Sequence, residues 1–80
     1  MKLDFQFDGV KYDFDFNPRW FIRGYETVHL QSFDAETNLQ RLSILFPIVD
    51  GKIVWDEMDK DIPQLVKGWC DRIVKLRAFA

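Results

Sequence analysis

Hydrophobic and polar residues alternate through positions 2–16, which is the pattern of β-strands with one buried face. The pair Asp8-Gly9 divides this run and favours a type I′ turn, so residues 2–16 are predicted to form a β-hairpin. A two-residue loop also fixes the register of the two strands. The core face then carries the pairs Phe7 with Val10, Phe5 with Tyr12, and Leu3 with Phe14.

The polar face of the same hairpin carries two carboxylates in direct opposition. The register pairs Asp4 with Asp13, with Cβ atoms about 5 Å apart, and like charges at that distance are destabilising. One interpretation is a cation site or a pair of carboxyl groups that share a proton. We favour a salt-bridge row, in which Arg23 from the next strand neutralises Asp13 and both Lys2 and Lys11 lie close by.

The pair Asn17-Pro18 is typical of a turn, because proline cannot donate to a β-ladder and asparagine favours turns. A loop at this point predicts a third strand over residues 20–32 that pairs back onto the hairpin. Val28 and Leu30 then keep the core parity. The predicted core pairs are Trp20 with Phe16, Ile22 with Phe14, and Gly24 under the ring of Tyr12.

Residues 39–55 contain a second Asp-Gly pair and are predicted to form another β-hairpin. The turn would pair Ile48 with Ile53 and Phe46 with Trp55, all on one face. Pro47 indicates that this strand is an edge strand or carries a bulge. The alternative is a helix over residues 35–45 that Asp34 caps and Pro47 ends. We favour the strand, because both apolar pairs fall on the same face.

Apolar residues return at helical spacing near the C-terminus, which predicts an acidic loop over residues 56–61 and an amphipathic helix over residues 62–78. Pro63 suits the first turn of a helix, and Lys75 suits its negative end. Gly68 in mid-helix costs about 1 kcal/mol relative to alanine, which suggests a close approach of the helix to the sheet. The apolar stripe is Ile62, Leu65, Val66, Trp69, Cys70, Ile73 and Val74.

The chain is therefore predicted to be a single α+β domain over residues 1–80. Its architecture would be a four- or five-stranded antiparallel β-meander with one C-terminal amphipathic α-helix packed on one face. With 48% hydrophobic residues, including eight Phe and three Trp, the chain has enough apolar side chains for a core. A single cysteine excludes an internal disulfide and favours a reducing compartment.

Acidic residues interrupt the apolar run at the N-terminus, unlike a signal peptide, and no apolar run is long enough to span a membrane. We therefore expect a cytoplasmic location, which includes the host cytoplasm if a phage encodes the protein. No grouping in the sequence predicts catalysis, a cofactor or a metal ion. His29 is expected on the outer face of the sheet, and Cys70 in the core stripe of the helix. The acidic loop lacks the spacing of a calcium loop.

A non-enzymatic protein-binding module is the function that this pattern favours. The predicted interaction residues on the sheet are Arg19, Phe21, Arg23 and Tyr25, of types enriched at binding hot spots. The acidic loop would help to select the partner by its charge, through Asp56, Glu57 and Asp59. Small acidic domains of this general type include many phage-encoded inhibitors of host defence enzymes. The most specific hypothesis is therefore an inhibitor or adaptor that binds a host protein, such as a nucleic-acid-handling defence enzyme.

Two alternatives stay open. The aromatic and arginine residues could stack on bases as a nucleic-acid-binding sheet, although the net charge of −2 and the pI of about 5.2 disfavour this. The protein could also be a small structural or assembly subunit, including a homo-oligomer. An edge strand that contains Pro47, or the exposed aromatic residues, would then make the contact.

Overall fold

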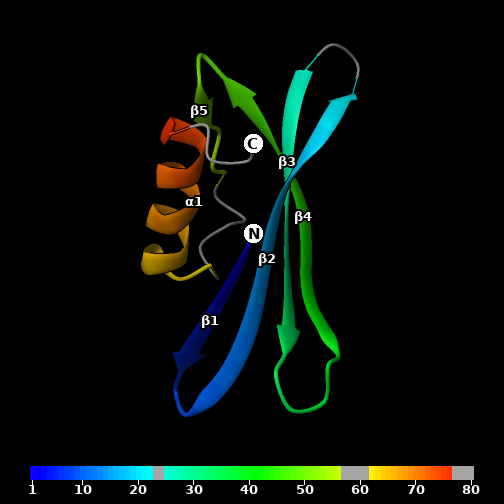
Figure 1. Cartoon of the computed structure of the whole chain (residues 1–80), viewed down its shortest axis with the longest axis vertical. Helices are drawn as coiled ribbons and strands as arrows, with labels where there is room; N and C mark the ends of the chain where they lie inside the picture. Colours follow the sequence, from blue (N-terminus) through cyan, green and yellow to red (C-terminus); the bar gives the residue numbers. More distant parts are fainter. Residues whose placement is uncertain (23–24, 57–61, 77–80) are drawn as a thin grey trace.

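The computed structural model describes residues 1–22, 25–56 and 62–76, and for residues 18–22 and 25 it describes the backbone alone. Within these ranges, one antiparallel sheet has the strand order β1-β2-β3-β4-β5. The strands are β1 (Lys2–Phe7), β2 (Val10–Ile22), β3 (Tyr25–Asp34), β4 (Gln40–Val49) and β5 (Lys52–Ile53), and the helix that follows them is α1 (Gln64–Leu76). Figure 1 shows α1 on one side of a strongly twisted sheet, beside β1 and β5. The predicted α+β meander with one packed helix is confirmed.

The first hairpin has the register that its Asp-Gly pair predicts. Asp8 and Gly9 both have positive φ angles, 51° and 78°, as a type I′ turn requires. Every predicted pair between β1 and β2 is present, and these pairs include Asp4 directly opposite Asp13. The local turn chemistry therefore determines which side chains of β1 and β2 share a face.

The predicted turn at Asn17-Pro18 is wrong, because β2 continues through both residues to Ile22. Phe16 exchanges backbone hydrogen bonds of 2.7 and 2.9 Å with Met1. The backbone N–H and C=O groups of Phe16, and those of every second residue of β2 counted from it, therefore face the β1 side. The nitrogen of Pro18 faces the same side, but β1 begins at Lys2, opposite Asp15, so no residue of β1 lies opposite Pro18. Proline therefore removes no hydrogen bond from the ladder, and the strand is not interrupted.

The longer β2 shifts the pairing of the third strand. β3 begins at Tyr25 and lies farther along the chain than the predicted strand over residues 20–32. The observed pairs are Phe16 with Leu30, Phe14 with Ser32, Tyr12 with Asp34 and Asp13 with Phe33, in place of the predicted Trp20, Ile22, Gly24 and Arg23. The salt-bridge row that was expected to neutralise Asp13 through Arg23 is therefore wrong as well.

The second Asp-Gly hairpin is confirmed, although its second strand ends at Ile53 and not at residue 55, and the alternative helix over residues 35–45 is wrong. β4 begins at Gln40, and Ile48 pairs with Ile53 across the turn. The rings of Phe46 and Trp55 meet edge to face with centroids 4.7 Å apart. The sequence predicts β4 correctly because its apolar residues alternate with a period of two.

The core lies between one face of the sheet and α1. Its buried side chains are Phe14, Phe16, Val28, Leu30, Phe46, Ile48, Ile53, Ile62, Val66, Cys70, Ile73 and Val74. Leu65 belongs to the predicted apolar stripe, yet it is 62% exposed. The close approach expected at Gly68 is also wrong, because a Cβ there would meet only Nη1 of Arg72, at 3.9 Å. No helix in the described ranges has both the length and the apolar character needed to cross a membrane.

The helix is too short to cover the whole core face of the sheet. At about 1.5 Å per residue, the 13 residues of α1 extend about 20 Å. β2 also has 13 residues, but a strand rises about 3.3 Å per residue, so its path is about twice as long as that of α1. In Figure 1, β1 and β2 continue past the first turn of α1 toward the turn that joins them. Within the described ranges, no helix covers the core-facing side chains at that end of the sheet.

Candidate functional site

An apolar cavity of about 430 Å³ lies where the helix stops covering the sheet. We call it the apolar groove. Its lining residues are Phe5, Phe7, Tyr12, Phe14, Ser32, Arg41, Leu42, Ile62 and Pro63. These residues come from the first four strands and from the segment just before α1. The groove therefore crosses the end of the sheet and is bounded on one side by the start of the helix.

The hairpin register supplies the aromatic wall of this groove. Alternation along β1 and β2 places Phe5, Phe7, Tyr12 and Phe14 on the core face, and all four line the groove. The ring of Phe14 packs against those of Phe5 and Tyr12, with centroids 6.1 and 6.4 Å apart. Phe7 is 53% exposed and makes the outer end of the wall. An exposed aromatic ring beside a cavity is typical of a surface that binds another molecule.

The charged residue that lines the groove is Arg41, and its guanidinium is paired with the carboxylate of Asp34, which does not line the groove. Oδ1 of Asp34 accepts hydrogen bonds from the backbone N–H groups of Glu36 and Thr37 at 2.9 and 3.1 Å. These two bonds are the main reason that the pKa of Asp34 lies below its ordinary value of 3.8. Nη2 of Arg41 lies 3.4 Å from Oδ2 of Asp34, a long contact for a charged pair. The side chain of Arg41 is 56% exposed, against 12% for Asp34.

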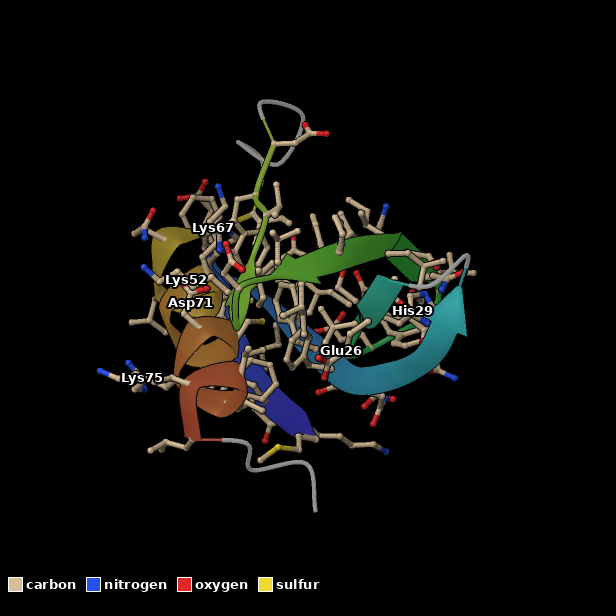
Figure 2. All side chains as sticks on the ribbon, turned by 90° about the horizontal axis from the view of Figure 1, so that it is seen from above. Glu26, His29, Lys52, Lys67, Asp71 and Lys75 are labelled. Carbon is tan, nitrogen blue, oxygen red and sulfur yellow. The ribbon has the colours of Figure 1, made fainter. Side chains whose placement is uncertain are left out.

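A histidine and a serine meet on the outer face of the sheet, the face opposite the helix. Nε2 of His29 lies 2.7 Å from Oγ of Ser43, although the two residues are not directly opposite in the register. Figure 2 shows His29 on the side of the molecule away from α1. Sequence reasoning missed this pair, because the register between β3 and β4 is needed to bring the two side chains together. Neither residue lines the apolar groove or the two cavities described next.

The second cavity, of about 470 Å³, lies between the turn after β4 and the helix. Trp55 lines it and is already engaged: its Nε1 donates to Oδ1 of Asp71 at 3.0 Å, and Nζ of Lys67 lies 5.6 Å from its ring centre. Figure 2 shows Lys52, Lys67 and Lys75 around Asp71 on this side of the helix. With both ring and N–H used in packing, Trp55 is a structural residue rather than a stacking platform.

The third cavity lies on the outer face over the first hairpin, and Asp4 and Asp13 line it together with Lys11. The two carboxylates are opposite each other, as the sequence predicts, and Phe33 is the neighbour of Asp13 on β3. No cluster of three or more potential metal ligands occurs among the residues that the structure describes. The carboxylate pair therefore has no further described ligand that would complete a metal site.

Most of the predicted interaction residues lie outside the described side chains. Arg19 and Phe21 belong to the last part of β2, and Tyr25 begins β3, but their side chains are not described. Arg23, Glu57 and Asp59 lie outside the described residues altogether. Asp56 is described and exposed. The aromatic–basic surface and most of the acidic loop that the sequence predicts therefore remain predictions.

No family model matches the chain, and searches among curated proteins and solved structures find no significantly similar protein. The geometry of the described residues is therefore the basis for a functional argument.

Proposed function

We propose that the protein is a non-enzymatic protein-binding module and that the apolar groove is its contact surface. The observation that supports this proposal is the aromatic wall at the uncovered end of the sheet, where Phe7 is 53% exposed beside a cavity of about 430 Å³. Burying an aromatic side chain in a partner stabilises a complex by about 1.5–3 kcal/mol, so such residues often dominate binding. A partner side chain that enters the groove would cover the part of the apolar sheet face that α1 leaves exposed.

The role that we assign to this binding is that of an inhibitor or adaptor acting on a host protein. The first hairpin, which forms the groove's aromatic wall, also carries Asp4, Asp8, Asp13 and Asp15. Asp4, Asp13 and Asp15 lie on the face of the hairpin opposite the groove, and Asp8 lies in its turn. Carboxylates around a binding surface favour partners with basic surfaces and accelerate their association. A nucleic-acid-handling defence enzyme, of the kind that phage proteins inhibit, has such a surface. The same acidic charge disfavours direct binding to a nucleic acid.

A site-specific photocrosslinker tests the groove as the contact surface. A benzoylphenylalanine residue is placed at Phe7 in one variant and at Leu45 in another, because Leu45 is similarly exposed, at 49%, but lies on β4 outside the groove. After irradiation in cell extract, we expect the Phe7 variant to give a discrete crosslinked protein and the Leu45 variant to give none. Equal labelling from both positions, or no labelling from Phe7, would contradict the proposal.

A parallel capture addresses the surface predicted from sequence. The double substitution Phe21→Ala and Arg23→Glu is compared with Phe7→Ser, using the same bait and the same extract. If the partner is lost only with the double substitution, the surface predicted around Phe21 and Arg23 is the contact surface and the groove is not. If it is lost only with Phe7→Ser, the groove is the contact surface.

Self-assembly through a strand edge is the second candidate. Among the described residues, β5 covers β4 only at Ile48 and Val49, so the side of β4 that faces away from β3 has no described strand beside residues 40–46. The carbonyl of Pro47 accepts a hydrogen bond from the N–H of Val54 at 3.0 Å, so the nitrogen of Pro47 also faces that side. An edge strand of this kind can pair with another chain. Light scattering that gives a monomer mass at 100 µM would exclude this candidate.

A further inference from the structure

We infer that the apolar groove binds a peptide segment of its partner in which an apolar anchor residue lies next to a carboxylate, and that Arg41 binds the carboxylate. This inference rests on the proposed function, because it specifies which partner segment enters the groove. It follows from three features of the described residues: the charge that the groove presents, the hydrogen-bonding state of Arg41, and the size of the apolar part.

The charge that faces the groove is positive. Arg41 is the only formally charged side chain among the described lining residues. Its partner Asp34 does not line the groove, and its side chain is 12% exposed against 56% for Arg41. A ligand in the groove therefore meets the guanidinium rather than the less exposed carboxylate. An anionic group on the ligand complements this arrangement, and a cationic group does not.

Arg41 also retains hydrogen-bonding capacity. A guanidinium group has five N–H donors. In the described part of the chain, its one ion pair is the 3.4 Å contact of Nη2 with Asp34. The charge of Asp34 is already stabilised by its two shorter bonds to backbone N–H groups. Arg41 can therefore bind a second carboxylate without leaving Asp34 unpaired, and the planar fork suits that group.

The start of the helix adds a second positive element to the lining of the groove. Ile62 and Pro63 line the groove and directly precede Gln64, the first residue of α1. The first turn of α1 contains no acidic side chain. The partial positive charge of a helix N-terminus is therefore not offset within that turn, and it favours an anion near the groove. This effect supports the contribution of Arg41 but does not define the site by itself.

The size of the groove fits a side chain and a short length of backbone. Its volume of about 430 Å³ lies near the lower end of the range of about 300–1,000 Å³ that is typical of ligand pockets. The aromatic wall provides faces and edges for one leucine, phenylalanine or tryptophan side chain. A carboxylate one to three positions away along a peptide would then reach the rim where Arg41 lies.

Selection from a random peptide library displayed on phage, with the intact protein as target, tests the inference. The winning peptides are synthesised with a fluorescein label and titrated against the protein by fluorescence polarisation, each beside an analogue in which its acidic residue is replaced by the amide. We expect enrichment of one aromatic or leucine residue with Asp or Glu within three positions. The acidic peptide should bind about fivefold more tightly than its amide analogue, which is the range of an exposed ion pair.

Matched variants assign the contacts. Phe7→Ser should weaken both peptides about tenfold or more, whereas Leu45→Ser should weaken neither. Arg41→Gln should weaken the acidic peptide to the level of its amide analogue and leave that analogue unchanged. Arg72→Gln, an exposed arginine on α1 outside the groove, is the charge control. Circular dichroism confirms that each variant is folded before the titration.

The outcomes separate this inference from the proposed function. Peptides that require Phe7 but show no acidic preference, or whose preference survives Arg41→Gln, would overturn the role of Arg41 and leave the groove as a binding surface. Peptides that bind Phe7→Ser as tightly as the unmodified protein would overturn the groove itself. A library that yields no peptide, or only peptides with basic residues beside the anchor, would also overturn the inference.

Discussion

Nε1 of Trp55 donates a hydrogen bond to Oδ1 of Asp71 at 3.0 Å, and this bond joins the segment after β5 to the helix. The same indole packs on Phe46, with ring centroids 4.7 Å apart, and lies under Nζ of Lys67. Helix, β4 and the returning segment therefore meet at one side chain. This contact holds the middle of α1 against the sheet, and the apolar groove lies at the N-terminal end of the helix.

Asp71→Ala should lower the free energy of unfolding. Loss of the hydrogen bond removes about 1 kcal/mol, and the higher helix propensity of alanine restores a few tenths of that amount. Urea denaturation followed by tryptophan fluorescence measures the change. Glu36→Ala, which truncates an exposed acid in the turn after β3, is the control and should change stability by less than about 0.5 kcal/mol. Equal losses in the two variants would mean that the bond contributes nothing.

Gly68→Ala should raise the free energy of unfolding by up to about 1 kcal/mol, because alanine is the better helix former. The new Cβ meets only Nη1 of Arg72 at 3.9 Å, an ordinary contact with a flexible side chain. Gly9→Ala provides the contrast: it also has open space, but its φ angle of 78° is unfavourable for alanine, so the variant should be less stable. Thermal melts of both variants test the pair. A destabilised Gly68→Ala variant would indicate that the helix packs more tightly than the structure describes.

The sequence predicts those parts of the fold in which short-range chemistry decides the conformation. Asp8-Gly9 and Asp50-Gly51 each determine a two-residue turn, and the pairs Leu3 with Phe14 and Ile48 with Ile53 follow from the turn alone. Asn17-Pro18 leads to a wrong prediction because the same two residues suit a turn and also a strand that has no paired residue of β1 beside the proline. Only the length of β1, a property of another element, decides between the two.

The candidate site is less predictable than the fold for a related reason. Alternation identifies Phe5, Phe7 and Tyr12 as core-facing residues, and they do share that face. That the core face is left uncovered at this point depends on where α1 begins, and on the difference in length between helix and strand. The contact between Arg41 and Asp34 depends on the turn that joins β3 to β4. The sequence leaves this turn open, because the alternative helix over residues 35–45 includes residues 35–37.

Asp4→Lys should stabilise the protein, because it replaces a like-charged pair with Asp13 by an opposite-charged pair. We expect a gain of up to about 1 kcal/mol at low ionic strength that diminishes at 1 M NaCl. Asp15→Lys is the contrast, since Asp15 is opposite Lys2 and lies 3.6 Å from the N-terminal amine, so its replacement should destabilise. If the Asp4–Asp13 pair instead holds a cation, calcium at millimolar concentration should raise the melting temperature of the unmodified protein and not that of Asp4→Lys.

Asp34 should make the stability depend on pH on the acid side. Its folded-state pKa lies below the ordinary 3.8, chiefly because the N–H groups of Thr37 and Glu36 bind the carboxylate. A carboxylate with a lowered pKa contributes stability that is present above the unfolded-state pKa and is lost as the pH falls through the folded-state pKa. Asp34→Asn should therefore be less stable than the unmodified protein at pH 7, and the difference should shrink below about pH 4. Urea midpoints at pH 7, 4 and 2.5 measure it, and a constant difference would contradict the assignment.

Cys70 should behave in the opposite sense, on the alkaline side. Burial raises the pKa of its thiol from 9.0 to about 12, with a smaller contribution from the charge of Asp71. The stability that the buried, neutral thiol contributes is complete below pH 9 and is lost as the pH rises toward the folded-state value. Cys70→Ala should remove this alkaline dependence while leaving the rest of the pH profile unchanged.

Thiol labelling checks the same residue directly. At pH 8 the buried thiol is protonated and inaccessible, so its reaction with a disulfide reagent should require opening of the helix from the sheet. The labelling rate should then rise with urea in parallel with the unfolded fraction, and Gly68→Ala should slow it by stabilising α1. Rapid labelling in the absence of urea would show that α1 separates from the sheet without global unfolding. In that case the apolar groove would be the edge of a larger surface that a partner could open.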